Sequence, residues 1–482
     1  KPGSTVEYTV EKIWRDHPLF AWKTVMPECN PVLKKDVTIR LADDFRGVRL
    51  DQSGIAPGES TQKVRNLEPI PEEPGRPDGW YFAPHQGIAA GSRSAMAAEL
   101  LRWLMKRSEE QSHAIAKARS LCAGLSGETE KIVAIKEFVE TAIRSTAPGY
   151  PELPLSALSA ADRTLQDGYG NSADRAILYK AMLDAVGVPC RFVALHNKEA
   201  SPEVIADAAA LTDPGDFPEI AVAAGTEIIP VYLNAGDRYT SPGSSNAERR
   251  LGWDLAEDRL RKIEVREPSM RNDVFEIRIA PDGSADVQWT LVLRGMDAGR
   301  MKRFLTELTP EELRRESQKL AAALSQNARL HGDLQMDWNK SPAEVRLSMT
   351  IPDFVPERNG YRQLTLPRWE ALTAPLTTAG HVRKTPLERI QSRETALHYN
   401  IIYPAAWTLL PERDFSGGDD FSRVSVKYSA ATDGKGNNRL QIDAKEELAA
   451  GILPPEDYGK LIRLQRQLSD PSMPLILLKS QK

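Results

Sequence analysis

The sequence predicts an α+β multidomain protein, with β-rich segments on both sides of a helix-led middle. At 482 residues the chain is too long for one ordinary hydrophobic core. Short alternating runs with Pro and Gly turns fill residues 1–88, and helical periodicity follows from residue 92. Alternating runs return after residue 270. We therefore expect three domains: an N-terminal β-sandwich at 1–110, an α+β core at 111–268 and a C-terminal β-rich region with inserted helices at 269–482.

The first segment has the pattern of several short strands. Ser4–Trp14 alternates apolar and polar residues, and shorter runs follow at Val32–Leu41, Val48–Leu50 and Val64–Ile70. The aromatic stretch Gly79–Pro84 is interpreted as a strand that packs its large rings into the sandwich. An aromatic binding strip is the alternative interpretation of the same residues.

The middle of the chain begins with helices. Ser92–Ala123 places its apolar residues at helical spacing, and a second helical start follows at Ser126. In that second helix Ile132, Ile135 and Val139 recur on one face. Both patterns predict amphipathic helices that pack on the core.

The stretch Asp167–Asn197 is the centre of the predicted core. Its glycines allow a tight turn, after which Asn171 is a plausible N-cap and Asp174 faces the exposed amides of the first helical turn. The following helix, Ala173–Val186, is apolar on most of its circumference, which is typical of a buried helix. Gly187 and the proline two residues later end the helix, and a strand is expected to follow.

This order of a glycine turn, a buried helix and a strand resembles the core of the transglutaminase-like family, whose fold is papain-like. The family motif is roughly Gly-Asp-Cys-x-Asp, and the corresponding residues here are Gly170-Asn171-Ser172-Ala173-Asp174. The family's nucleophilic cysteine lies on the first helical turn, where the helix N-terminus stabilises a thiolate. In this chain Ser172 occupies that position.

The resemblance also implies where the other two members of a Cys-His-Asp triad would lie. The segments Phe217-Pro218-Glu219 and Tyr232-Leu233-Asn234 match the family's histidine and aspartate segments in their flanking residues. The positions equivalent to the triad are then Ser172, Glu219 and Asn234. A serine needs a positioned base, and a carboxylate with a pKa of roughly 4.3 is a weak base for a hydroxyl. Replacement of all three residues predicts that the chemistry has been lost.

Other residues near this motif are candidates to replace the triad or to line a cleft. His196 is expected to be a surface histidine at a strand end, and Cys190 to be a buried, inert thiol. Asp237, three residues beyond Asn234, is an alternative position for the acid. Tyr169, beside the glycine turn, is expected to join His196 and the three triad-equivalent residues in lining a cleft.

The last two hundred residues are predicted to be β-rich. Val274–Ile279 and Ala285–Leu293 flank a Pro-Asp-Gly turn, which predicts a hairpin, and Thr309 with Glu312 forms a capping-box pattern. A short amphipathic helix is expected at Pro455–Leu468. Two glycine-containing stretches are interpreted as turns rather than as phosphate or calcium sites: Gly417–Asp420 and Asp433–Gly436. Further strands are expected at Ala343–Ile351, Arg362–Leu366, Ala396–Ile402, Arg423–Ser429 and Arg439–Ala444.

Composition limits the function classes. The net charge of −4 gives no support for nucleic-acid binding, and no run approaches the roughly 18 apolar residues of a membrane-spanning helix. The three cysteines, Cys29, Cys122 and Cys190, lie far apart in the sequence and form no metal-ligand pattern. The sequence leaves open whether two of them form a disulfide. The dispersed histidines predict no structural zinc, and no cofactor is expected.

The order of the predicted domains resembles a group of bacterial envelope-associated proteins of unknown function. This resemblance implies a periplasmic, cell-envelope or secreted location, with a signal peptide already removed. The first hypothesis is a catalytically inactive protein that binds a polypeptide, another protein or a saccharide in its cleft. The alternatives are an active cysteine- or serine-type hydrolase or acyltransferase using Ser172, and a purely structural spacer. The sequence leaves the oligomeric state open.

Overall fold

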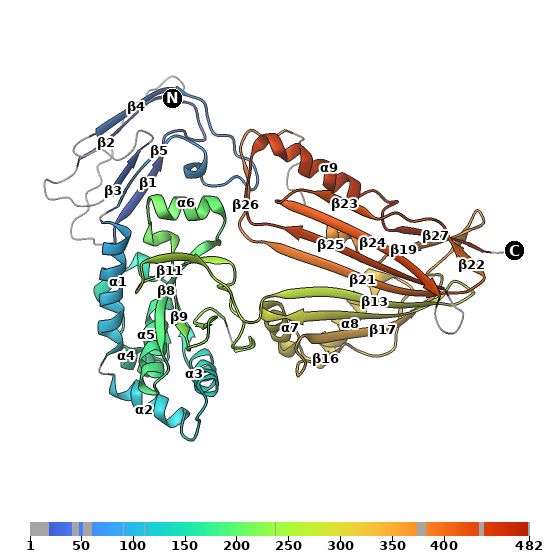
Figure 1. Cartoon of the computed structure of the whole chain (residues 1–482), viewed down its shortest axis with the longest axis horizontal. Coiled ribbons are helices and arrows are strands. Elements are labelled where there is room, and N and C mark those ends of the chain that lie inside the picture. The colour runs from blue at the N-terminus through green and yellow to red at the C-terminus, as the bar shows by residue number, and fades with distance from the viewer. Residues whose placement is uncertain are drawn as a thin grey trace.

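The computed structural model confirms a mixed α+β protein with several β-sheets and a helix-led middle (Figure 1). Three features expected from the sequence lie outside the residues that it describes: the strand Ser4–Trp14, the turn Asp433–Gly436 and Asp237. The described residues are 19–40, 48–51, 60–89, 91–109, 111–236, 238–373, 382–432 and 438–480.

Two small antiparallel sheets make up the described N-terminal part. One has the order β1-β5-β3 and the other pairs β2 with β4. The expected strand at Gly79–Pro84 is wrong, because Gly79–Tyr81 forms a 3₁₀ turn capped by the Asp78 side chain. Trp80 of this turn is nevertheless buried, as the packing interpretation required. The strands are β1 (Ala21–Val25), β2 (Val32–Ile39), β3 (Val48–Asp51), β4 (Ser60–Leu67) and β5 (His85–Ala89).

Helices and a five-stranded antiparallel sheet form the middle of the chain. The helical stretch expected at Ser92–Ala123 is two helices, and the first ends at Ser108, whose hydroxyl donates to the Met105 carbonyl. A buried helix, α5, packs on strands β8 and β9 of a five-stranded antiparallel sheet ordered β10-β9-β8-β11-β12. The helices are α1 (Arg93–Ser108), α2 (Ser112–Leu121), α3 (Glu128–Ala142), α4 (Ala161–Asp167), α5 (Ser172–Ala185) and α6 (Pro202–Ala210). The strands are β8 (Cys190–Glu199), β9 (Glu219–Ala224), β10 (Val231–Leu233), β11 (Arg250–Asp254) and β12 (Arg259–Lys262).

The two faces of this sheet bury different sets of side chains. Ile220 and Val222 of β9 join the large apolar cluster that contains α5. Their neighbours Ala221 and Ala223 point to the other face and join a smaller cluster with Leu195. The alternation of a β-strand therefore decides which residues can meet the start of α5.

The C-terminal part is built on a long sheet ordered β15-β17-β14-β13-β21-β25-β24-β23, with β16 also paired to β17. The expected hairpin and capping box are confirmed in β13, β14 and α8. Helices α7 and α8 pack toward β13, β14 and β17, whereas α9 packs near β23 at the other end (Figure 1). A four-stranded sheet, β18-β19-β27-β22, shares the same apolar cluster.

The elements of this part have the following bounds. The helices are α7 (Gly295–Glu307), α8 (Pro310–Leu324) and α9 (Tyr458–Leu468). The strands of the long sheet are β13 (Met270–Ile279), β14 (Ala285–Arg294), β15 (Arg329–Leu330), β16 (Gln335–Asp337), β17 (Ala343–Ile351), β21 (Arg393–Tyr403), β23 (Phe415–Gly418), β24 (Ser422–Thr432) and β25 (Asn438–Leu448). The others are β18 (Glu357–Arg358), β19 (Tyr361–Thr365), β20 (Leu387–Arg389), β22 (Trp407–Leu409), β26 (Gly451–Leu453) and β27 (Leu475–Ser480).

Residues 383–392 connect the three parts of the chain. The buried Arg383 guanidinium donates to the Pro74 carbonyl of the N-terminal part at 2.8 Å. Lys198, at the end of β8, forms an ion pair with Glu388 at 2.6 Å, and β20 pairs with β26. The connection is therefore made by hydrogen bonds and ion pairs of low exposure as well as by the chain itself.

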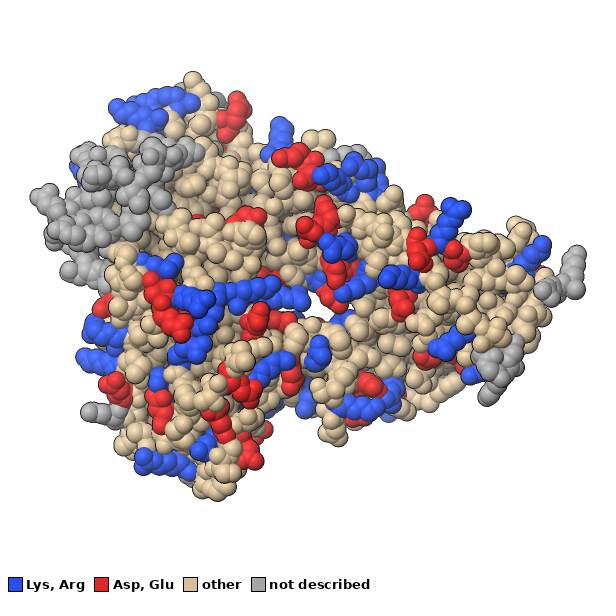
Figure 2. Space-filling view, viewed as in Figure 1, with Lys and Arg blue, Asp and Glu red and all other residues tan. Residues whose placement is uncertain are grey.

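Basic and acidic side chains are intermingled on the face of the molecule that Figure 2 shows. No helix in the described ranges has both the length and the apolar character needed to cross a membrane.

Candidate functional site

The start of helix α5 has the cap that the sequence predicts. The Asn171 side-chain oxygen accepts hydrogen bonds from the amides of Ala173 and Asp174 at 2.9 and 3.0 Å. Asp174 returns a bond by accepting from the Asn171 amide at 3.1 Å. A β-carbon on Gly170 would lie 2.8 Å from the Asp174 β-carbon, so the turn before the helix requires glycine.

A buried ion pair lies within the helix packing. Arg175, which interrupts the apolar pattern of α5, donates to Glu140 of α3 at 2.9 Å. Tyr179 donates to the other oxygen of the same carboxylate, also at 2.9 Å. Both side chains of the ion pair are less than a tenth exposed. A buried charge needs such a partner, so this trio fixes α5 against α3.

The Ser172 hydroxyl, in the position expected for a nucleophile, bonds to the backbone of β9. It donates to the Pro218 carbonyl and accepts from the Ile220 amide, each at 3.3 Å. These backbone groups belong to the residues before and after Glu219, and the Glu219 side chain takes no part in either hydrogen bond. The hydroxyl therefore joins the first turn of α5 to the start of β9.

Asn234 is brought next to Ser172, as its triad-equivalent position requires. Its backbone has a positive φ of 66°, a conformation that asparagine tolerates better than most residues. The side-chain nitrogen donates to the Ser172 carbonyl at 2.6 Å and to the Ile220 carbonyl at 2.7 Å. Asn234 thus holds the end of β10 against both α5 and β9.

Glu219 does not join this pair. In the alternation of β9 it points with Ala221 to the face of the sheet opposite α5. There its carboxylate accepts from the Arg250 guanidinium at 3.2 and 3.3 Å. The structure therefore brings Ser172 and Asn234 together and holds the Glu219 side chain on the other side of the sheet.

His196 is buried, so the expectation of a surface histidine is wrong. It has the same position in the alternation of β8 as Ala194 on the α5 face, and its ring meets the edge of the Phe217 ring at 5.1 Å between centroids. Phe217 in turn packs against Trp253, and both of these rings are fully buried. The position of His196 near the end of a strand does not predict its burial, because the rings that pack around it come from segments 20 to 60 residues further along the chain.

The surroundings of His196 fix its protonation. Nδ1 accepts a hydrogen bond from the Lys198 amide at 3.0 Å, so the proton of the neutral ring is on Nε2. Nε2 is buried and has no partner among the described residues. Burial lowers the pKa of the imidazole to about 4. In this arrangement the ring offers a proton rather than a free lone pair, so it is not placed as a base for Ser172.

The remaining expected residues lie apart from one another. Tyr169 is about half exposed on the short strand β7 (Tyr169–Gly170), which pairs with β6 (Arg144–Ser145). Cys190 is partly exposed rather than fully buried, and burial of its sulfur raises its thiol pKa to about 12. All three cysteines are free.

A cluster of charges beside His196 was not anticipated from the sequence. Lys23 of β1 forms ion pairs with Asp207 and Asp216 at 2.9 and 3.0 Å, and Trp80 also donates to Asp207. Burial raises the pKa of Asp207 despite these partners. The residues come from three distant segments, so spacing along the chain carries no signal of the cluster. In the described ranges, no group of three or more His, Cys, Asp or Glu side chains could hold a metal ion.

Comparison with known proteins agrees with this description of the core. Residues 115–215 match the family model of the transglutaminase-like superfamily. The fold is similar to the crystal structure of a putative protease from Parabacteroides distasonis, with a TM-score of 0.57 and 15% identity, covering 96% of this chain and 76% of that one. No curated protein matches the sequence. Residues 115–215 therefore form a transglutaminase-like domain, set between β-rich parts of the chain.

Proposed function

We propose that this chain is a catalytically inactive transglutaminase-like protein that binds a polypeptide or saccharide. One observation carries the proposal: the Ser172 hydroxyl and the Asn234 amide nitrogen are both hydrogen-bonded to backbone groups, and among the described residues neither bonds to a side chain that could act as a base. Their hydrogen bonds position α5, β9 and β10. Residues at the triad-equivalent positions thus stabilise the fold.

Chemical requirements support the same conclusion. Acyl transfer by a serine needs a base within hydrogen-bond reach of the hydroxyl. Glu219 lies on the opposite face with Arg250, and His196 presents a protonated Nε2. Asn234 carries no charge to balance an imidazolium, and its amide nitrogen donates to two backbone carbonyls instead. The group that would activate Ser172 is therefore missing from the described arrangement.

The binding role and the location rest on resemblance. A structural neighbour named as a putative protease supports a polypeptide ligand. The resemblance to bacterial envelope-associated proteins supports a location in the cell envelope, in the periplasm or outside the cell. Fold alone does not assign function, so a direct assay decides.

The test compares the wild-type protein with Ser172→Ala on glutamine-containing peptides with amine donors, and on general protease substrates. We expect no turnover by either protein above a buffer control. Binding of the same peptides, and of envelope oligosaccharides, is measured in parallel by calorimetry. Turnover by the wild type that disappears in Ser172→Ala refutes inactivity, and failure of every peptide and saccharide to bind refutes the binding role.

The second candidate is a serine-dependent hydrolase or acyltransferase that uses Ser172. It is favoured by the partial exposure of Ser172 at a helix N-terminus and by the position of His196 on the same face of the sheet. This candidate predicts covalent labelling of Ser172 by a fluorophosphonate probe, located by peptide mass spectrometry. We expect no label at Ser172, and labelling there that requires His196 would favour the enzyme.

A further inference from the structure

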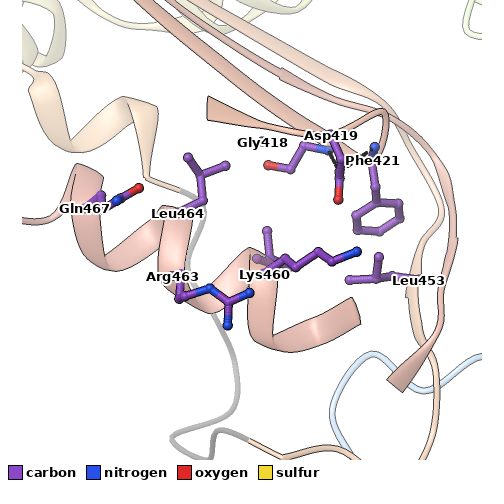
Figure 3. A pocket seen from close by; sticks show the side chains of 10 residues that line it. Gly418, Asp419, Phe421, Leu453, Lys460, Arg463, Leu464 and Gln467 are labelled. Carbon is purple, nitrogen blue, oxygen red and sulfur yellow. Dashed lines mark hydrogen bonds between the residues drawn. The ribbon is translucent and has the colours of Figure 1, made fainter. Parts of the chain in front are cut away.

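A cavity far from the core lies between helix α9 and the turn that joins β23 to β24 (Figure 3). Its volume is about 290 Å³, at the lower end of the range of small-molecule sites. Lys460 and Arg463 lie on its helix side, and Asp419 and Phe421 lie on its turn side. The cavity therefore combines two cations, one carboxylate and an apolar wall.

The turn side of the cavity is rigid. Asp419 Oδ1 accepts from the amides of Phe421 and Ser422 at 2.9 and 3.1 Å, and the Asp419 amide donates to the Ser422 carbonyl at 2.8 Å. Behind the Phe421 ring, the Arg389 guanidinium stacks at 4.1 Å and donates to the Phe421 carbonyl at 2.6 Å. Phe421 is thus held in place before any ligand arrives, which reduces the entropy lost on binding.

Two groups of the cavity lack partners in the described part of the chain. The Ser422 side chain lines the cavity, is only 3% exposed, and its hydroxyl makes no hydrogen bond. A buried hydroxyl without a hydrogen-bond partner is unfavourable, so this group favours a ligand that bonds to it. Arg463 makes no ion pair with the described residues, whereas Lys460 is paired with Asp457 at 2.7 Å. Arg463 is therefore the cation that is available to an anionic ligand.

From these groups we propose that the cavity binds the carboxylate of an apolar amino acid, either free or at the end of a polypeptide. Arg463 takes the carboxylate, for which its planar guanidinium can offer two parallel donors. The Asp419 carboxylate accepts from the nitrogen next to it, and Ser422 supplies a further hydrogen bond. The apolar side chain lies against Phe421 and Leu464. This site is separate from Ser172, so it stands or falls independently of the proposed function of the core.

The experiment titrates three probes into the full chain and follows binding by ligand-observed NMR. N-acetyl-L-leucine represents a polypeptide end, L-leucine the free amino acid, and N-acetyl-L-leucinamide lacks the carboxylate. We expect millimolar binding of at least one of the two acids and about tenfold weaker binding of the amide. Tighter binding of N-acetyl-L-leucine identifies a polypeptide end as the ligand, whereas tighter binding of L-leucine identifies a free amino acid.

Variants locate the binding. Arg463→Gln is expected to weaken binding of the acid about tenfold. Arg466→Gln, one turn along α9 and outside the cavity lining, is expected to leave this binding unchanged. Ser422→Ala is expected to weaken binding while the unliganded protein stays at least as stable, because an unsatisfied hydroxyl is removed. Equal binding of acid and amide, no binding of either acid, or binding that Arg463→Gln does not change would overturn the proposal.

Discussion

The burial of His196 predicts that the core becomes less stable in mild acid. The imidazole has a pKa of about 4 in the folded chain, against 6.5 when it is exposed. Well above pH 6.5 the ring is neutral in both states, and its effect on stability becomes negligible. Between pH 6.5 and pH 4 the unfolded chain binds a proton that the folded chain does not, so stability falls as the pH falls.

The size of this effect follows from the two pKa values. Proton uptake by the unfolded chain lowers the free energy of unfolding by about 2 kcal/mol at pH 5 and by about 0.2 kcal/mol at pH 7. His196→Asn keeps an acceptor for the Lys198 amide but cannot titrate. Relative to the wild type, the variant is therefore expected to gain about 2 kcal/mol between pH 7 and pH 5.

The assay is urea unfolding at both pH values, with hydrogen exchange of the peptides covering β8 and α5 as the readout for the core. Ile177→Val is the matched control, because it removes one buried methyl group and no titrating group. It should cost about 1 kcal/mol at both pH values. If the difference between His196→Asn and the wild type is the same at pH 7 and pH 5, the imidazole is not held neutral by burial and the reasoning is wrong.

Three further substitutions test the contacts that hold the core together, each measured by urea unfolding at pH 7. Asn234→Ala removes two hydrogen bonds and places alanine at a positive φ, so the free energy of unfolding is expected to fall by about 2–3 kcal/mol. A fall below about 0.5 kcal/mol would contradict the role of this side chain. Glu140→Ala leaves the Arg175 guanidinium buried and unpaired, so about 3–5 kcal/mol should be lost, and a neutral result would mean that the arginine reaches water. Gly170→Ala brings a β-carbon to 2.8 Å from that of Asp174, and the cap must shift, with an expected cost of about 1–3 kcal/mol; unchanged stability would show that the turn has room.

Local features of the fold could be predicted because they depend on neighbouring residues. The cap formed by Asn171 and Asp174, the glycine end of α5 at Gly187 and the capping box at Thr309 all involve groups within a few residues of one another. Their hydrogen bonds form wherever the helix forms. The β13–β14 hairpin is local in the same sense, because a short turn sets its register.

The candidate site could be predicted only in part. The resemblance to the transglutaminase-like family placed Ser172 and Asn234 near each other, but it did not reveal that Glu219 would point away from them. A strand sends successive side chains to opposite faces, so a shift of one residue decides whether a carboxylate meets the helix or the other side of the sheet. Ser172 bonds to backbone groups of Pro218 and Ile220, and such bonds cannot be predicted from the identity of side chains.

The sequence by itself determined the α+β class, the buried helix after the glycine turn and the presence of Ser172 at the start of that helix. These follow from periodicity, capping and residue identity, which are properties of short stretches. The tertiary structure alone decided that His196 is buried and protonated on Nε2, and that Lys23 meets Asp207 and Asp216. Those outcomes depend on segments up to 193 residues apart, because burial and charge pairing are set by whichever parts of the chain pack together in space.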